Sequence, residues 1–340
     1  MILVTGGAGF IGSHMVGALN AKGRRDVVVC DLLRSGPKWR NLRRCVFADF
    51  IPPDELAGWL DGRRLEAVIH LGANSSTLAV DGDDVIRRNF RFSLMLLDWC
   101  TKAGVPFIYA SSAATYGDGT LGFEDRDDGA FLATLRPLNL YGWSKHAFDQ
   151  TVAARRESGA PLPPACWGLK FFNVYGPNEV HKGEMRSVVH KVFETLQREE
   201  PVQLFRSHRP DYADGEQLRD FVWVEDVVAA IQFLLAGPRG AGLLNLGNGT
   251  ARTWLDLVRA VGAAMSVTPD IRFIDMPEAL REKYQYWTEA RLDRLRGLGY
   301  NAAFASLEEG VRETIAELMA PLSSQAPRTS EHRFATVRAS

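Results

Sequence analysis

Residues 2–12, Ile-Leu-Val-Thr-Gly-Gly-Ala-Gly-Phe-Ile-Gly, decide how the rest of the chain is expected to fold. Strand-forming residues lead into a glycine cluster, and an apolar helical pattern follows at once. Gly6, Gly9 and Gly12 have the spacing that predicts a strand, a tight turn and a helix. Such a turn brings backbone N–H groups and the start of a helix close to a pyrophosphate, so it predicts a bound dinucleotide.

An acidic residue stands where the adenosine ribose of such a dinucleotide would lie. The next apolar run, residues 27–30, ends in Asp31, about 20 residues after the glycines. Alone, Asp31 would equally suit a solvated strand end or a helix cap, but its place in the same βαβ unit favours the ribose. The basic loop that follows (Arg34, Lys38, Arg40) is normally a solvated turn. Beside adenosine it suits a 2′-phosphate, which favours NADP, whereas Asp31 favours NAD.

Composition sets wide limits on the function. The chain has 340 residues, 46% of them hydrophobic, and a formal net charge of −1, which gives no electrostatic reason to expect nucleic acid or a membrane surface as partner. No apolar run reaches the roughly 18 residues of a membrane span. The cysteines show no paired spacing and suit buried thiols in a reducing compartment, so we expect a cytoplasmic protein. They are Cys30, Cys45, Cys100 and Cys166.

Strand and helix patterns alternate through the first half, which predicts an α/β fold with a Rossmann-type, doubly wound parallel sheet over residues 1–170. Further strands are expected at 45–47, 67–70 and 106–110. Ligands of such sheets lie at the carboxyl ends of the strands. Asp49, just after the third strand, is expected near the adenine. His70 is expected to be a packed, hydrogen-bonded histidine, and Asn89 to fix a loop or a nicotinamide.

Two further patterns carry the chemistry. The fifth strand delivers Ser111 and Ser112 to the carboxyl edge, where a serine pair usually caps the next helix. No histidine and acid pair stands near them, which disfavours a serine hydrolase. Tyr141 and Lys145 are four residues apart at the head of a helical pattern and so share one face. Together with the glycine turn they predict hydride transfer, with Tyr141 as base and Ser112 binding the substrate oxygen. Lys145 and the nicotinium ring of the cofactor are the candidate cations that would lower the pKa of Tyr141.

The motifs resemble the nucleotide-sugar epimerases of the extended short-chain dehydrogenase/reductase family, and within it the epimerases that act on ADP-heptose. The resemblance covers about residues 1–318. The motifs shared widely in the family are T-G-G-A-G-F-I-G, S-S-A-A-T-Y-G (111–117) and Y-G-W-S-K (141–145). The more specific ones are D-L-L-R-S-G-P-K (31–38), F-F-N-V-Y-G-P (171–177), H-K-G-E-M-R-S-V-V-H (181–190), R-D-F-V-W-V-E-D-V (219–227) and K-Y-Q (283–285).

This resemblance implies inversion at C6 of a heptose carried on ADP, through a transient 6-ketone made with tightly held NADP. It assigns proton handling on opposite faces of the sugar to Tyr141 and Lys182, with Ser112 and Lys145 assisting Tyr141. The residues expected around the cofactor are Gly6, Gly9, Phe10, Ile11, Gly12, Asp31, Leu32, Lys38, Asp49, Leu71, Gly72, Ala73, Asn74, Ser75, Asn89, Tyr141, Lys145, Val174 and Lys182. Those expected around the substrate are Ser112, Asn173, Glu184, Ser187, His190, Phe205, Arg206, Arg219 and Tyr284.

The second half departs from strict alternation, and we expect residues 171–320 to form a smaller substrate-binding lobe, with residues near 205–250 returning to the first domain. Asn173 is expected to end a strand and Asp226 to cap a helix or act as a fixed structural acid. The loop 206–218 is longer than the family pattern, and its stretch 211–217 is expected to be exposed. Residues 321–340 are polar and aperiodic, which predicts a disordered tail.

Some residues depart from the family pattern and leave alternatives open. Pro53 stands where a lysine often helps to hold NADP, which weakens that expectation, and Glu184 replaces a small polar residue. Rival functions are another nucleotide-sugar 4-epimerase or dehydratase, and a non-catalytic NAD(P)-sensing protein. Ala113 and Ala114 replace the acidic pair of a 4,6-dehydratase, and the retained Ser112, Tyr141 and Lys145 disfavour a sensor. We expect no metal site, and we expect a homo-oligomer.

Overall fold

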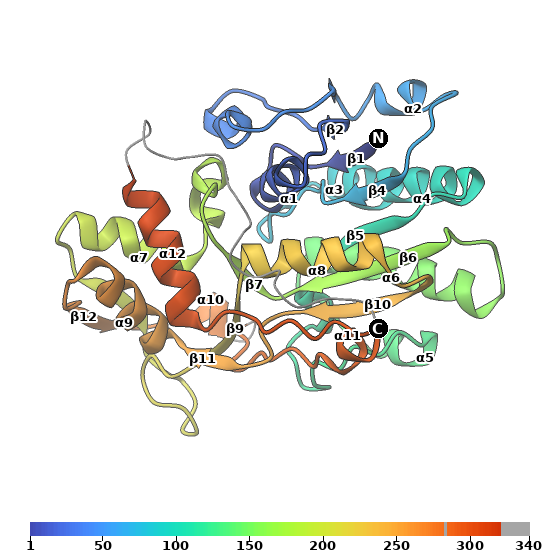
Figure 1. Ribbon diagram of the computed structural model, residues 1–340. Coiled ribbons are helices and arrows are strands. Elements are labelled where there is room, and N and C mark those ends of the chain that lie inside the picture. Colours follow the sequence, from blue (N-terminus) through green and yellow to red (C-terminus); the bar gives the residue numbers. More distant parts are fainter. Residues whose placement is uncertain (282–283, 321–340) are drawn as a thin grey trace.

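A computed structural model describes residues 1–281 and 284–320, and the predicted disordered tail lies outside this range (Figure 1). The main sheet is seven-stranded and parallel, in the order β10-β6-β5-β4-β1-β2-β3. It confirms the predicted doubly wound fold. Its strands are β1 (Ile2–Thr5), β2 (Val27–Cys30), β3 (Asp49–Ile51), β4 (Ala67–His70), β5 (Phe107–Ser112), β6 (Ala165–Phe171) and β10 (Gly240–Leu246).

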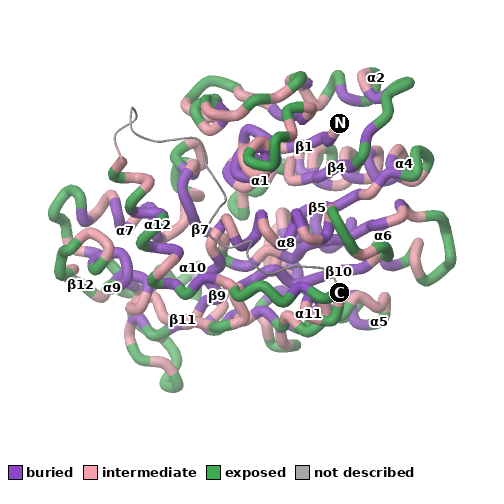
Figure 2. Tube along the Cα trace, viewed as in Figure 1, coloured by how far each residue is buried: buried purple, intermediate pink, exposed green. Residues whose placement is uncertain are grey.

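Helices cover both faces of this sheet because its strands are buried on both sides. On one face Leu3, Val68 and Phe107 pack with side chains of α4 and α6, and on the other Val4 and Ile69 pack with α1 and α8. Figure 2 shows the buried strands between these layers. The helices are α1 (Phe10–Ala21), α2 (Leu56–Trp59), α3 (Gly82–Val85), α4 (Phe92–Ala103), α5 (Gly129–Leu132), α6 (Leu140–Glu157), α7 (Val188–Gln197), α8 (Val224–Ala236), α9 (Trp254–Met265), α10 (Glu278–Arg281), α11 (Asp293–Gly297) and α12 (Leu307–Met319).

A second body of structure follows β6. Strands β11 (Ala251–Thr253), β9 (Leu218–Trp223) and β7 (Asn173–Tyr175) form a small sheet, and β12 (Ile271–Ile274) pairs with β8 (Val202–Phe205). Side chains from α7, α9 and α12 bury a separate core with them, including Val189, Leu257 and Val311. The remaining short helical turns are η1 (Pro37–Leu42), η2 (Ile86–Arg91), η3 (Ala113–Tyr116) and η4 (Val180–Met185).

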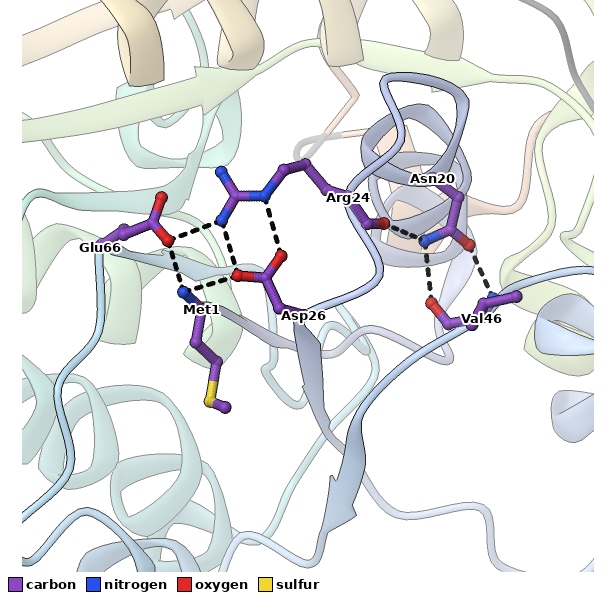
Figure 3. A network of polar contacts seen from close by, with 6 residues as sticks. All are labelled: Met1, Asn20, Arg24, Asp26, Val46 and Glu66. Carbon is purple, nitrogen blue, oxygen red and sulfur yellow. Dashed lines mark hydrogen bonds and ion pairs between the residues drawn. The ribbon is translucent and has the colours of Figure 1, made fainter.

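A polar network ties the amino ends of β1 and β2 together, at the edge opposite to the strand ends where ligands bind (Figure 3). The amino group of Met1 lies 2.8 Å from Asp26 and 2.6 Å from Glu66, and Arg24 pairs with both acids. Asn20 adds hydrogen bonds to the backbone of Arg24 and Val46. These contacts fix the base of the sheet and leave the carboxyl edge to the site.

Three local expectations were wrong, and for Asp226 one of the two roles left open is excluded. The third strand is Asp49–Ile51 rather than 45–47, and Asn173 begins β7 rather than ending a strand. Trp223 is the N-cap of α8, so Asp226 does not cap it; its carboxylate instead accepts from the N–H of Ala305 at 2.8 Å, which is the structural role left open. Within 211–217, Gly215 and Gln217 are buried, because the loop folds back toward the second sheet.

No helix in the described ranges is both long and apolar enough to cross a bilayer.

Candidate active site

The glycine turn is built around close contact between backbones. Gly6 has φ +67°, and a Cβ there would lie 2.7 Å from the N atom of Gly72, at the end of β4. A Cβ on Gly12 would collide with the carbonyl oxygen of Gly6, so only glycine lets α1 start this close to the strand. No side chain of the described chain caps α1, and its first N–H groups point out of the helix start. This cradle fits a pyrophosphate.

Asp31 is held beside that turn. One carboxylate oxygen accepts from the N–H of Ala8 at 2.9 Å, and the other from the N–H of Leu32 at 2.7 Å and from Lys38 Nζ at 2.5 Å. Lys38 also donates to the carbonyl of Leu32 at 3.2 Å. A cation therefore lies directly on the acid at the expected ribose position, and it offsets the negative charge there.

The loop after β4 is fixed from beneath by Asn89, which lies in the π-helical turn η2 and is fully buried. Its carboxamide accepts from the N–H of Asn74 and donates to the carbonyl of Asn74 and to Ser144 Oγ, at 2.7–3.0 Å. These bonds use the side chain within the protein, so Asn89 shapes the loop 71–75 and links it to α6. His70 is packed as predicted, with hydrogen bonds to Thr5 and Ser93.

Ser112 and Tyr141 meet at the carboxyl edge. Ser112 ends β5 and its Oγ accepts from the N–H of Ala114, so it caps the next turn as predicted. Asn139 caps α6 and places Tyr141 in the first turn, where the phenol hydrogen-bonds with Ser112. Burial raises the pKa of Tyr141, while the bond with Ser112 opposes this. The net shift of the Tyr141 pKa in the protein is thus upward, opposite to the expected lowering.

Lys145 lies one helical turn from Tyr141 and is 3% exposed. Burial lowers the pKa of its ammonium group to about 8, and the negative charge of Asp149 opposes the shift. It is thus a buried cation on the phenol's own helix.

Lys182 enters from the segment after β7. It lies in η4, with Nζ 2.7 Å from the carboxylate of Glu179 and 5.0 Å from the centroid of the Phe10 ring. It lines a cavity of about 280 Å³. The other lining residues are Phe172, Asn173, Val174, Tyr175, Met185, Arg186, Ser187, Val188, Val189, Phe221, Trp254 and Leu257.

Two predicted sugar contacts, Asn173 and Ser187, thus share one cavity with Val174, which was predicted to contact the cofactor. Asn173 is exposed at the start of β7, Val174 follows it, and Ser187 has a buried hydroxyl with no hydrogen-bond partner within the described chain. An unsatisfied buried hydroxyl at a cavity wall suits a ligand hydroxyl. His190 is buried away from it and hydrogen-bonds with the carbonyl of Gly176 at 2.9 Å.

Arg219 lies beside Trp254, which is one of the lining residues of the cavity. It is 7% exposed, and its guanidinium lies over Trp254 and Tyr284, 5.5 and 4.9 Å from the ring centroids. Burial lowers its pKa. It has no ion pair with any acidic group in the described residues, so it remains available to an anion. Phe205 packs edge-on against Tyr284 at 6.4 Å.

Three further predicted site residues, Glu184, Arg206 and Asp49, do not line the cavity. Glu184 is 87% exposed and 3.4 Å from Lys191, and Arg206 is 55% exposed on the rim. Asp49 opens β3 and accepts from the indole of Trp59 at 3.0 Å. Sequence reasoning missed the buried acids Glu179 and Asp149 and the buried Lys170. For Asp149 a signal existed, because it follows Lys145 by four residues.

The comparisons with known proteins agree with this geometry. The model of the NAD dependent epimerase/dehydratase family matches residues 2–247. The chain belongs to this family. It is 48% identical over 324 residues to the ADP-L-glycero-D-manno-heptose-6-epimerase of Nitratidesulfovibrio vulgaris strain DP4. This alignment covers 94% of this chain and 98% of the relative.

Solved structures extend the likeness. The ADP-L-glycero-D-manno-heptose-6-epimerase of Helicobacter pylori matches with a TM-score of 0.76 and 26% identity, over 94% of this chain and 96% of that one. UDP-glucose 4-epimerase of Thermus thermophilus, in complex with NAD, matches with a TM-score of 0.71 and 27% identity, over 93% and 97%. The resemblance carried by the motifs is confirmed, and this family member is an isomerase.

Proposed function

We propose that this epimerase interconverts ADP-D-glycero-D-manno-heptose and ADP-L-glycero-D-manno-heptose by NADP-dependent oxidation at C6 and re-reduction from the opposite face. The observation that carries the proposal is the presence of two candidate proton-handling groups on different elements: Tyr141 paired with Ser112, and Lys182 in the wall of the cavity. Tyr141 and Ser112 come from α6 and β5, and Lys182 comes from η4. The relatives named for this reaction support the choice of sugar.

In the oxidation half, Ser112 and Tyr141 hold the C6 oxygen. Tyr141 takes the hydroxyl proton while the hydride leaves C6, so that the alcohol becomes a ketone. Bound NADP supplies the hydride acceptor and, while oxidised, a positive charge near the phenol. That charge and Lys145 together favour the phenolate against the burial that raises the Tyr141 pKa.

In the reduction half, the ketone presents its other face and Lys182 gives the proton to the oxygen as the hydride returns to C6. Glu179 holds the Lys182 side chain in place for this step, because its buried carboxylate lies 2.7 Å from Nζ. Each turnover leaves Tyr141 protonated and Lys182 neutral, so before the next turnover in the same direction Tyr141 releases its proton to solvent and Lys182 takes one up. In the opposite direction the two groups exchange roles. Water is kept from the ketone by the walls that also place the sugar, including Phe172 and Val174.

Groups at opposite ends of the site bind the cofactor and the ADP part of the substrate. Lys38 supports NADP over NAD, since it neutralises Asp31 at the ribose position. At the other end, the guanidinium of Arg219 suits the diphosphate of ADP, because it donates to the carbonyl of Leu218 at 2.8 Å but has no ion pair within the described residues. Tyr284 lies beside it, and Phe205 packs against Tyr284. Asn173 and Ser187 would bind sugar hydroxyls between them.

The test is direct. The purified protein is incubated with each C6 epimer of ADP-glycero-manno-heptose without added cofactor. The two epimers are then separated and their amounts measured. Interconversion from both sides supports the proposal, and failure with ADP-heptose but turnover of another nucleotide sugar would transfer the assignment to the 4-epimerase rival. Tyr141→Phe is expected to lower turnover by about 10²–10⁴-fold with the cofactor retained.

We further propose that residues 1–170 with the segment near 205–250 bind NADP, and that 171–320 bind mainly the sugar. A cytoplasmic site of action is supported by the four cysteines, all free thiols. A homo-oligomer is supported by apolar side chains left on the surface, such as Trp143 on α6, which is 47% exposed.

A further inference from the structure

A carboxylate lies one helical turn beyond Lys145 in the interior of the protein. Asp149 is fully buried, and both of its oxygens accept from hydroxyls of β5: Ser111 Oγ at 2.6 Å and the phenol of Tyr109 at 3.2 Å. Both donors are neutral. The hydrogen bonds of this carboxylate therefore bring no positive charge to it, although buried charges are normally paired with an opposite charge.

Two buried lysines supply the matching charge. Lys145 precedes Asp149 on α6, and Lys170 comes from β6, in register with Ser111. Lys170 is fully buried, its Nζ lies 4.1 Å from the centroid of the Tyr116 ring, and that nitrogen has no hydrogen-bond partner within the described residues. Neither lysine is within 4.0 Å of Asp149, so the three groups interact through the low-dielectric interior.

We propose that Asp149 is a positioning residue, which keeps Lys145 charged beside Tyr141, and that Lys170 competes with Lys145 for the same carboxylate. The proposal rests on the proposed function of Tyr141 and Lys145. Without Asp149, burial alone acts on Lys145, and its proton is lost at a lower pH. Without Lys170, a second positive charge beside the same carboxylate no longer repels the ammonium group of Lys145, and the proton is kept to a higher pH.

The pKa directions agree with this arrangement. Burial lowers the pKa of each lysine to about 8, and Asp149 opposes the lowering in both. Burial raises the pKa of Asp149, and Lys170 and Lys145 both oppose that. Other titratable groups facing these three residues are Tyr141 on α6, His70 on β4, Tyr109 on β5, and Asp125, Asp127 and His146 around Lys170.

The experiment follows Lys145 itself. Protein labelled with ¹³C at the lysine Cε is titrated by NMR, and the Lys145 resonance is assigned by its loss in Lys145→Met. We expect Asp149→Asn to move the Lys145 midpoint to lower pH by about one pH unit or more, and Lys170→Met to move it to higher pH. Asp149→Glu, which retains the charge, is the conservative control and should stay near the wild-type midpoint.

Opposite movements from two buried substitutions would not follow from loosened packing alone. An unmoved midpoint in Asp149→Asn, or movement of both variants in the same direction, overturns the proposal. If Asp149→Asn does not fold, the Lys170→Met variant alone tests the proposal. A Lys145 midpoint that is unmoved or lowered in Lys170→Met also overturns the proposal.

Activity adds a second readout. The alkaline limb of the pH–rate profile should move with the Lys145 midpoint, down in Asp149→Asn and up in Lys170→Met. The titration needs neither sugar nor added cofactor. The proposed role of Asp149 can therefore be rejected independently of the proposed epimerase activity. A moving midpoint in a protein that does not convert ADP-heptose would reject only the substrate. Turnover with an unmoved midpoint would reject only the role of Asp149.

Discussion

The ammonium nitrogen of Lys182 lies 2.7 Å from a carboxylate oxygen of Glu179, a side chain that is completely buried. The same carboxylate accepts from the N–H of Ser187 at 2.8 Å, so one acid holds both a proposed base and a proposed sugar contact. Glu179 therefore fixes two residues that line the cavity, Lys182 and Ser187.

Lys182→Met should lower kcat by about 10²–10⁴-fold because one of the two proton-handling groups is lost. Glu179→Gln should lower kcat in the same direction, since Lys182 loses its counter-charge and its fixed position. It should also lower Tm, because breaking a buried pair leaves its partner uncompensated. Steady-state kinetics and thermal melts check both effects. The exposed Glu200→Gln is the control, and full activity in Glu179→Gln would contradict the arrangement.

Local sequence rules found what depends on local structure. The glycine spacing and the Tyr141 to Lys145 interval fix a turn and a helical face, and both appear where predicted. Glu179 and Lys170 were missed because their importance depends on which elements become neighbours: Lys170 matters only through the pairing of β5 with β6. Likewise, the loop 211–217 was expected outside because its acidic composition gave no sign that Tyr212 would pack 5.2 Å from Tyr286.

Lys38→Met should weaken NADP binding about tenfold or more relative to NAD, because Asp31 then faces the 2′-phosphate without its neutralising partner. Binding of each dinucleotide to cofactor-free protein, measured by titration calorimetry, gives the ratio. The exposed Lys102→Met controls for loss of one positive charge. An equal loss of affinity for NAD and NADP would show that Lys38 attracts the phosphates of both dinucleotides and does not determine which of them binds.

Arg219→Met should raise the KM for the nucleotide sugar by about 10–100-fold, as expected for loss of a charged hydrogen-bond donor to phosphate, with a smaller effect on kcat. Arg219→Lys should restore little, because an ammonium group does not stack between Trp254 and Tyr284 as a planar guanidinium does. The methionine variant should melt at a higher temperature than the wild type, since the desolvated cation lacks a carboxylate partner. An unchanged KM together with a lowered Tm would show a purely structural arginine.

Asp125 makes stability depend on pH. It is 6% exposed, and one of its carboxylate oxygens has no hydrogen-bond partner among the described residues. Burial raises its pKa to about 6, while the charge of Arg294 opposes the shift. A carboxyl group whose pKa is higher in the folded state favours folding only while it is protonated. This contribution is complete below the ordinary value of 3.8 and is lost as the pH rises through about 6.

Asp125→Asn removes this charge at every pH. The variant should therefore melt a few degrees above the wild type at about pH 7.5, and the difference should shrink as the pH falls from about 6 toward 4. Thermal melts at several pH values, with the exposed Asp61→Asn as control, measure the difference. A difference that stays constant with pH would mean that the amide acts through packing, and one that grows at low pH would mean that the carboxylate stabilises the fold through Arg294.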